Sequence, residues 1–560
     1  MCVTTMTTEI INKWNSTTFD KLFIFDTTNR NEIVPYLQAI DEIQQKLLVS
    51  SNDQMTSKSH LVPIIVSRLT KEFHNILKVN SKSTPSSLNN NPNLNTQSTT
   101  MTDSAASNYE VYDDDVYVSR ETMMKNECVV DLRNIVTRMH AFGFVKDCLK
   151  VYVNERKLVI DNEFERMKVE KLSEYSAKRL EWGVLEMKIE IWIKTMKICF
   201  NYCFEYEKRL CELIFHDLGE DSSLVDDCFM DVIMDYMKLL LDNAEALSSI
   251  RVAPERLFKI LDVYDTLCSA RPLMNNFFNR QGWEVLGSRA ENEIVPKLGD
   301  KVREILFKFE NSVVKEKSSF VCKEPVHQLA KYVMHNVYKL CDYKDTLTGI
   351  ALSDLPSMDA VEMRSESLVL EGGNGFSVHI VWIVLSLISN LEVKASLIKD
   401  PLVSRFFLMN NFRYISQKVQ GRPEMRERVG DENMNKLIQK FQRARDDYLK
   451  LSLEAVLRCL RDEGLNNTRR LPQRVSKLTE RLKKFNAEFE KLQKDHRKSV
   501  VADFELMVEL RKSIVEMVVV AYTNFLRHTE NIPRLQTYIK SSAEEIESVI
   551  QEFFVYNPTR

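Results

Sequence analysis

Apolar side chains recur at helical spacing along most of this chain. Between residues 182 and 203 they follow one another at steps of three and four, at Trp182, Leu185, Ile189, Trp192, Met196, Cys199 and Cys203. Such steps place side chains on one face of an α-helix, so this stripe predicts a helix that buries that face. Similar spacing predicts helices within residues 36–48, 62–77, 129–167, 177–215, 248–278, 324–347 and 377–398.

Glycine and proline indicate where some of these helices should begin or break. The 129–167 segment is expected to form two helices that part near Gly143. In the 248–278 segment, a helix is expected to begin at Pro254 and to end before Pro272, because proline suits a first turn but not a helix interior. The 377–398 segment is apolar on all sides, so we expect it to lie deep between other helices.

The composition favours an all-α fold. The 560 residues include only 13 glycines and 14 prolines, fewer than the turns of an all-β or mixed protein of this length need. Apolar residues make up 44% of the chain, which is enough to build cores, but the chain is too long for a single compact one. We therefore expect several domains or one elongated array of helices.

One segment differs from the rest in composition. Residues 80–108 are almost entirely Asn, Ser, Thr and Pro and cannot bury enough apolar area to offset the entropy of ordering them. A disordered linker is expected there, and the acidic and aromatic stretch 112–117 is interpreted either as solvated linker or as a docking element. The expected organisation is a short helical segment at 1–79, the linker at 80–118, helical bundles at 119–400 and a basic helical bundle at 401–560.

Positive charge is concentrated near the C-terminus. The formal net charge is -3, yet residues 401–500 hold 24 Lys and Arg against 13 Asp and Glu, a net of +11. A basic block on an otherwise acidic chain favours a polyanionic partner, which could be a membrane, a nucleic acid or an acidic protein.

Residues 474–492 combine this charge with a helical apolar stripe. The apolar stripe is expected to dock in the C-terminal bundle and consists of Val475, Leu478, Leu482, Phe485, Phe489 and Leu492. A second stripe, expected to face outward and to contact a partner, consists of Arg474, Lys477, Arg481 and Lys484. The alternative is a solvated face on which Glu480, Glu488 and Glu490 pair with nearby lysines.

No motif indicates an enzyme, a cofactor or a metal site. The His-Glu-x-x-His, Walker and Gly-x-Ser-x-Gly patterns are absent, and the 11 cysteines lack ligand spacing, so reduced thiols are expected. The glycines of 371–376 follow no strand and precede no Lys-Ser/Thr pair, so they are interpreted as a flexible loop. Neither a signal peptide nor a membrane-spanning stretch is recognised, which favours a cytoplasmic protein with at most peripheral membrane contact.

Several phrases, in order, resemble the family of the seventy-kilodalton exocyst subunit (Exo-seventy), with a plant-type member as the nearest kind. The principal phrase is DPLVSRFFLMNNFRYISQKV at 400–419. Further similar phrases lie at 253–267, 327–347, 381–400, 460–465, 478–492, 509–526 and 537–554. The resemblance runs from about residue 119 to the end of the chain.

This resemblance implies an elongated rod of consecutively stacked helical bundles, in a complex that tethers secretory vesicles at the plasma membrane. It also implies that the C-terminal bundle binds acidic lipids, notably phosphatidylinositol bisphosphate, partly through a Lys-Tyr-Ile-Lys phrase. Here that phrase begins with Thr537 and keeps only Lys540, with Arg534 three residues before it. The lipid-binding residues expected are Lys540, Arg534, Arg474, Lys477, Arg481 and Lys484.

The partners expected are other exocyst subunits and acidic plasma-membrane phospholipids, and small GTPases are left open as a further class. A diverged helical adaptor that binds regulatory proteins without tethering is the alternative function. Nucleic acid is not expected as a partner, because the basic block has neither interleaved exposed aromatic residues nor a known motif for recognising nucleic-acid sequences.

Overall fold

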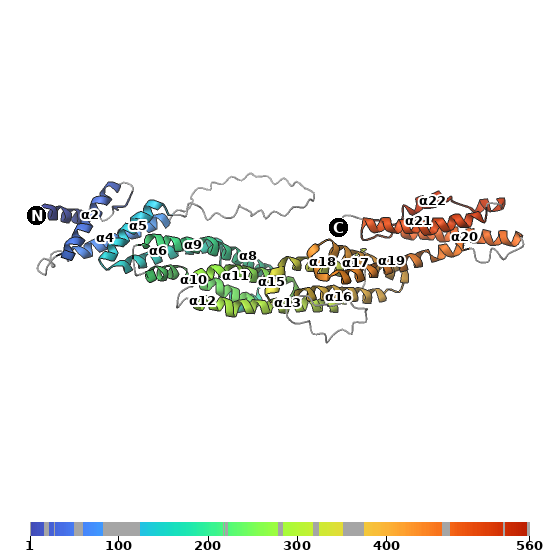
Figure 1. The fold of residues 1–560 in the computed structure, drawn as a ribbon, viewed down its shortest axis with the longest axis horizontal. Coiled ribbons are helices and arrows are strands. Elements are labelled where there is room, and N and C mark those ends of the chain that lie inside the picture. The colour runs from blue at the N-terminus through green and yellow to red at the C-terminus, as the bar shows by residue number, and fades with distance from the viewer. Residues whose placement is uncertain are drawn as a thin grey trace. The chain divides into compact units, whose positions relative to one another are not determined.

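The described residues of the computed structural model are helical, apart from short turns and one isolated bridge (Figure 1). The structure describes residues 2–15, 22–26, 29–49, 60–81, 124–216, 218, 222–277, 284–316, 324–350, 375–461, 471–529 and 532–556. Backbone contacts divide the chain into two compact units. The first comprises residues 1–251 and 262–301, and the second comprises 252–261 and 302–560. The expected all-α fold class is confirmed.

The first unit is a series of helices that pack mainly on helices close to them in sequence. Its elements are α1 (Cys2–Trp14), α2 (Arg30–Val49), α4 (Leu61–Ser81), α5 (Asn126–Ala141), α6 (Val145–Met167), α7 (Glu174–Arg179), α8 (Trp182–Ile198), the π-helical turn η3 (Cys199–Cys203), α9 (Phe204–Ile214), α10 (Ser222–Ser248), α12 (Glu284–Arg289) and the π-helical turn η6 (Ala290–Ile294). Contacts link α1 to α2, α4 to α5 and α6, and α6 and α9 to α10. The helices of this unit therefore stack mostly on helices that are near them in the sequence.

Two more helices, α11 (Leu257–Phe277) and α13 (Val295–Lys315), have residues in both units. The second unit also contains η5 (Pro254–Arg256), α14 (Gln328–Leu340), η7 (Cys341–Tyr343), α15 (Lys344–Gly349), α16 (Gly375–Ser396), α17 (Pro401–Gln420), α18 (Pro423–Val429), α19 (Asp431–Leu460), α20 (Leu471–His496), α21 (Phe504–Arg527), η9 (Pro533–Tyr538) and α22 (Ala543–Ile550). The 30-residue helix α19 packs on α17, α20 and α21, which makes it the common support of this unit.

Most of the predicted helices are confirmed, and two predicted boundaries are wrong. The split near Gly143 occurs between α5 and α6, where this glycine has φ 81°, a value that residues with a Cβ rarely adopt. The helix expected from 177 begins at Trp182, because residues 174–179 form the separate helix α7.

The predicted end before Pro272 is also wrong, because α11 continues through this proline to Phe277. A proline removes one backbone N–H from the helix, which usually weakens it at that point. Here Leu267 before the proline and Met274 after it are both fully buried, so packing on either side keeps the helix continuous.

Helix α16 lies in the core, as its apolar sequence predicted. Fifteen of its residues are buried, including Ile380, Ile383 and Leu387. Among the described helices, α16 alone is long and apolar enough to cross a membrane. However, 72% of its 18-residue apolar stretch is buried inside the protein. Burial of this kind is typical of a core helix rather than of a lipid-facing one.

Two predicted irregular segments lie outside the described residues. Only Asn80 and Ser81 of the predicted linker at 80–118 are described, and they belong to the end of α4. The acidic stretch 112–117 is not described. Of the glycine-rich stretch 371–376, only the start of α16 is described. The predicted four-part organisation of the chain stays a prediction.

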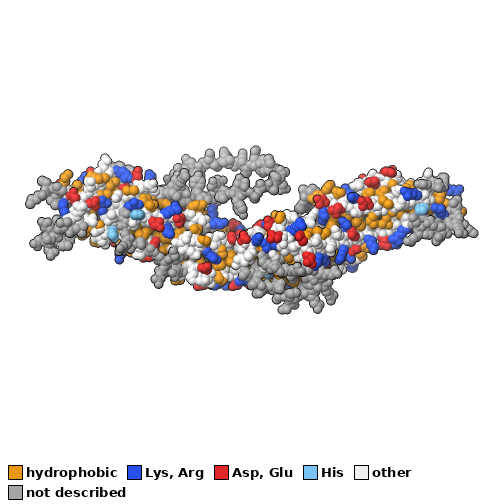
Figure 2. All heavy atoms as spheres, viewed as in Figure 1, with side chains coloured by type: hydrophobic (Ala, Val, Ile, Leu, Met, Phe, Trp, Pro, Cys, Tyr) orange, Lys and Arg blue, Asp and Glu red, His pale blue; other side chains and the backbone are white. Residues whose placement is uncertain are grey.

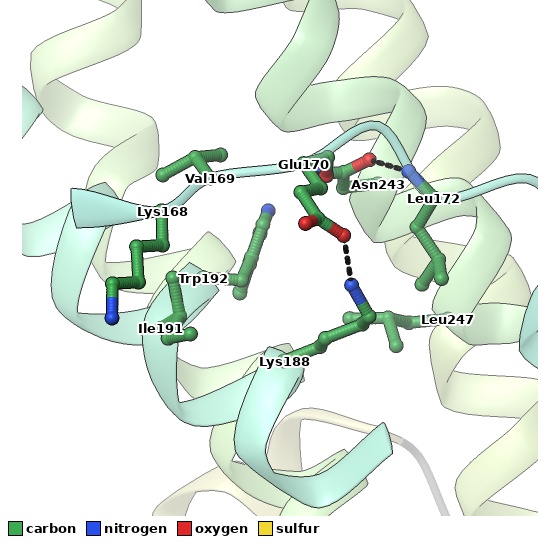
Figure 3. Close-up of a pocket in the computed structure, with 9 residues that line it drawn as sticks. All are labelled: Lys168, Val169, Glu170, Leu172, Lys188, Ile191, Trp192, Asn243 and Leu247. Carbon is green, nitrogen blue, oxygen red and sulfur yellow. Dashed lines mark hydrogen bonds and ion pairs between the residues drawn. The ribbon is translucent and has the colours of Figure 1, made fainter. Parts of the chain in front are cut away.

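A buried asparagine holds the turn that follows α6. Asn243 of α10 is 4% exposed; its Oδ1 accepts a hydrogen bond from the Leu172 backbone N–H at 2.7 Å, and its Nδ2 donates to the Glu170 carbonyl at 3.0 Å. Trp192 lies beside them and donates from its indole N–H to the Leu240 carbonyl. The hollow among these residues has about 20 Å³ of free volume, enough for one water (Figure 3).

Asn243→Ala should destabilise the first unit by about 2 kcal/mol, because it leaves the buried Leu172 N–H and the part-buried Glu170 carbonyl without their partner. Urea denaturation and hydrogen exchange at residues 168–172 measure this. Asn292→Ala is the matched control. Asn292 is exposed, its side chain donates to the Ser288 hydroxyl on the surface of the same helical segment, and its loss should change stability by less than about 0.5 kcal/mol. Equal effects of the two substitutions would contradict the anchoring role.

Candidate functional site

The apolar stripe of α20 docks in the second unit, as the sequence predicted. Leu478, Leu482 and Phe485 are at most 2% exposed, and Phe489 and Leu492 are also buried. Val475 is only half-buried. The helix packs on α19 and η9, and the ring of Phe485 stacks on Tyr522 of α21 at 4.7 Å between ring centroids. This packing fixes which side chains of α20 face outward.

The four basic residues predicted on the second stripe are not equivalent. Lys477 and Lys484 are exposed, whereas Arg474 and Arg481 are half-buried at the edge of the packed face. The Arg481 guanidinium donates to the backbone carbonyl of Arg461. The Nε of Arg474 is buried, and no hydrogen-bond partner is found for it among the described residues.

Lys484 forms an ion pair with Glu480, one turn before it on the same helix. Their N–O distance is 2.7 Å, and both side chains are about two-thirds exposed. The hydrogen bond between them raises the pKa of Lys484 and lowers the pKa of Glu480, so both stay charged. This pair has the geometry that the alternative interpretation, a solvated face, predicts.

The other two predicted site residues lie beyond η9. Lys540 pairs with Glu490 of α20 at 3.0 Å, with both side chains about two-thirds exposed. Arg534 is exposed, and no ion pair is recorded for it within the described part of the chain. The neighbouring Tyr538 accepts a hydrogen bond from Asn486 through its carbonyl, and its ring lies 5.1 Å from the Lys483 amino group.

Lys540 does not join the predicted basic stripe. At 100° per residue, Glu490 lies about 120° round α20 from Lys484 and about 180° from Arg481. The structure therefore brings Lys540 to one flank of α20 and leaves Arg474 and Arg481 on the other. Figure 2 shows Lys and Arg side chains interspersed with Asp and Glu on the visible face, rather than gathered into one patch.

The exposed side of α20, which faces away from its apolar stripe and lies between these two flanks, is rich in lysine. Five lysines are exposed there: Lys477, Lys483, Lys484, Lys491 and Lys494. Three of them were not among the predicted site residues. Their helical spacing was visible in the sequence, but the position of η9, which decides which side of α20 stays open, was not. We call these five residues the lysine face.

The end of α20 is held by a buried histidine that sequence reasoning missed. His496 is 2% exposed, with Nε2 3.1 Å from the Tyr448 hydroxyl and Nδ1 3.0 Å from the Leu492 carbonyl. Its backbone carbonyl accepts from the N–H of Phe554, and Arg511 donates to the Phe553 carbonyl. Burial lowers the pKa of His496 to about 4. The C-terminal segment is thereby fixed against α20.

No metal-binding group of three or more His, Cys, Asp or Glu is found among the described residues. Cys199 and Cys211 are buried free thiols, and Cys203 is a half-buried one. His327 caps α14, because its Nδ1 accepts a hydrogen bond from the Leu329 N–H.

Comparisons with a family profile and with individual proteins both find similarity to exocyst components. A family profile for the C-terminal part of the Exo70 exocyst complex subunit matches residues 190–552. Exocyst complex component EXO70C2 of Arabidopsis thaliana is 32% identical over 445 residues, covering 77% of this chain and 61% of that protein. EXO70B1 of Arabidopsis thaliana is 32% identical over 430 residues, covering 76% of this chain and 66% of that protein. The chain thus spans less than two-thirds of the length of these relatives.

The fold has a counterpart among solved structures. The crystal structure of the S. cerevisiae exocyst component Exo70p superimposes with a TM-score of 0.54 at 15% identity, covering 98% of this chain and 99% of that one. At this identity the likeness concerns the fold alone.

The buried His496 predicts a pH dependence of stability. Its pKa is about 4 in the folded protein and about 6.5 when unfolded, so between pH 6.5 and 4 only the unfolded state takes up this proton. The free energy of unfolding of the second unit should therefore fall as the pH drops through this window, by on the order of 3 kcal/mol from this residue.

Urea denaturation at several pH values between 7 and 4 measures the slope in the wild type and in His496→Gln. The variant should be less stable at pH 7 but should lose less stability on acidification. Identical slopes in the two proteins would show that His496 does not titrate in the expected way.

Proposed function

This chain belongs to the Exo70 family of exocyst subunits, and on that premise we propose that it helps to tether secretory vesicles at the plasma membrane. The family match over residues 190–552 carries this proposal, because it covers most of both the described chain and the second unit. The relatives are named as exocyst complex components. The family is not one of enzymes, so its members act by binding.

The proposed mechanism is bridging. Other exocyst subunits would bind along the stacked helices, and acidic phospholipids, notably phosphatidylinositol bisphosphate, would bind the second unit. The protein would then lie in the cytoplasm, peripherally attached to the inner face of the plasma membrane. Small GTPases remain a further class of partner within this proposal.

The lysine face of α20 supports the lipid contact better than the predicted arginines do. Its five side chains are exposed between Lys477 and Lys494, a stretch of 18 residues that spans roughly 26 Å of one helix. Arg474 and Arg481 are half-buried and would have to leave the packed edge of α20 before reaching a flat membrane. Cations close to an anionic leaflet are attracted over a distance of about a Debye length, so this contact should weaken with salt.

The ion pairs of Lys484 and Lys540 are compatible with this contact. Both pairs are exposed, and exposed ion pairs are weak because water and salt screen them. Lipid phosphates can therefore compete with Glu480 and Glu490 for these amino groups. The same two glutamates should oppose binding, since Glu480 carries negative charge within the lysine face and Glu490 carries it at one edge.

Reversing three charges in Lys477→Glu, Lys484→Glu and Lys491→Glu should reduce sedimentation with liposomes that contain phosphatidylinositol bisphosphate by more than tenfold, since each change replaces an attraction with a repulsion. Removing two negative charges in Glu480→Gln and Glu490→Gln should increase it. Sedimentation is measured at 50 and 200 mM salt, with neutral liposomes as reference.

The matched control reverses Lys171, Lys178 and Lys197 to Glu in the first unit, with circular dichroism to verify the helical content of each protein. A similar loss in the control would mean that net charge alone governs binding. Unchanged sedimentation of the α20 variant would exclude the lysine face as the lipid contact.

Assembly is tested separately, by purifying the tagged chain from plant cells and identifying what accompanies it. A tethering subunit should bring the other exocyst subunits in near-equal amounts. Their absence, with regulatory proteins in their place, would favour the alternative of a diverged adaptor. Thr537 favours that alternative, because it removes one of two lysines that the resemblance implies for lipid binding.

A further inference from the structure

Helices α6 and α10 of the first unit lie side by side and run parallel (Figure 1). Their contacts advance together along both helices: Lys157 pairs with Asp235 at 2.8 Å, and the Tyr236 hydroxyl donates to the Lys157 carbonyl and to Asp161. The Asn243 contacts described above continue this register after the end of α6. The C-terminal halves of the two helices are thus closely joined.

The N-terminal halves of the same helices are not closed against each other. A hollow of about 370 Å³ lies between them, lined by Lys146, Leu149, Lys150, Val153 and Asn154 of α6 and by Leu224, Asp227, Cys228 and Asp231 of α10. On each helix the lining positions follow one another at alternating steps of three and one, which places them on one face, so the hollow is a groove that follows the two helix axes. We call it the α6–α10 groove.

The floor of the groove is apolar. Cys228 is buried, and Leu149, Val153 and Leu224 are half-buried, so each exposes part of its side chain to the groove. These positions leave room for apolar side chains of another molecule. Burying them would remove further apolar surface from water, which favours association.

The two rims of the groove carry opposite charges. Lys146 and Lys150 line the α6 side, and Asp227 and Asp231 line the α10 side. All four side chains are exposed, and no ion pair is recorded for any of them in the described part of the chain. One or two turns further on, the same arrangement of lysine on α6 and aspartate on α10 does form a pair, Lys157 with Asp235. The groove therefore holds the two rim lysines too far from the two rim aspartates for ion pairs of this kind.

We propose that the α6–α10 groove binds one amphipathic helix of a protein partner. A helix laid along the groove presents apolar side chains at i, i+3, i+4 and i+7 to the floor, which is the way helices dock in hydrophobic grooves. Its acidic flank faces Lys146 and Lys150, and its basic flank faces Asp227 and Asp231. Such a helix fills the space between the two rims. Its charged flanks form ion pairs with the lysines of one rim and the aspartates of the other.

The rim charges argue against other kinds of partner. An acidic membrane or a nucleic acid would meet Lys146 and Lys150 favourably but would be repelled by the two aspartates beside them. A helix with mixed flanks satisfies both rims, so its recognition depends on the pattern of charge rather than on net charge. This inference uses only the first unit and does not depend on exocyst assembly or on lipid binding.

The probe is a synthetic helix of 14 residues, cross-linked on its outer face, with leucine at i, i+3, i+4 and i+7, glutamate on one flank and lysine on the other. Two control peptides carry glutamate on both flanks or lysine on both. Fluorescence anisotropy with the full chain should show that the mixed peptide binds roughly tenfold more tightly than either control, because two exposed ion pairs are gained.

Lys146→Glu with Lys150→Glu makes both rims acidic, so the preferred probe should change from the mixed peptide to the one with lysine on both flanks. Lys171→Glu with Lys178→Glu carries the same change of charge away from the groove and should keep the original preference. A switch of preference cannot result from unfolding. No saturable binding of the mixed peptide, or the same preference in the rim variant as in the wild type, would overturn the proposal.

Discussion

Most of the described helices bury an apolar stripe against neighbouring helices, and this burial is the constraint on which the structure depends. Isolated helices are marginally stable in water, so their stability here comes from packing. Helix α19 illustrates this, since it provides a common surface for α17, α20 and α21. The Phe485–Tyr522 stack and the buried His496 then fix the rotation and the end of α20.

The same constraint decides what is available for binding. Once α20 has buried Leu478, Leu482 and Phe485, the side chains on its back must face outward, and these include the five lysines of the lysine face. In the first unit, α6 and α10 close tightly at Lys157 and Asp235 but not near their N-termini. Both proposed contacts therefore lie where packing leaves charge or apolar surface unsatisfied. The two proposed contacts would recognise partners in different ways, one through exposed charge and the other through an apolar groove with charged rims.

The candidate site shows how far charge patterns in a sequence can be interpreted. The basic character of residues 401–500 was evident, and so was the outward direction of Lys477 and Lys484. Arg474 and Arg481 were expected on the same surface, yet they lie at the packed edge, and Lys540 lies on the opposite flank. An ion pair such as Lys540–Glu490 joins residues 50 positions apart, so no helical spacing could indicate it.

The sequence alone determined the helical class, the positions of most helices and the family, because apolar spacing and short phrases are local properties. It also determined that α16 would be buried, since a helix that is apolar on every side has no face suited to water. Only the tertiary structure decided that α11 continues through Pro272, which side of α20 stays open and where α6 and α10 part. These features depend on contacts between distant segments, and the free energy of such contacts exceeds local preferences whenever the packed surface is large.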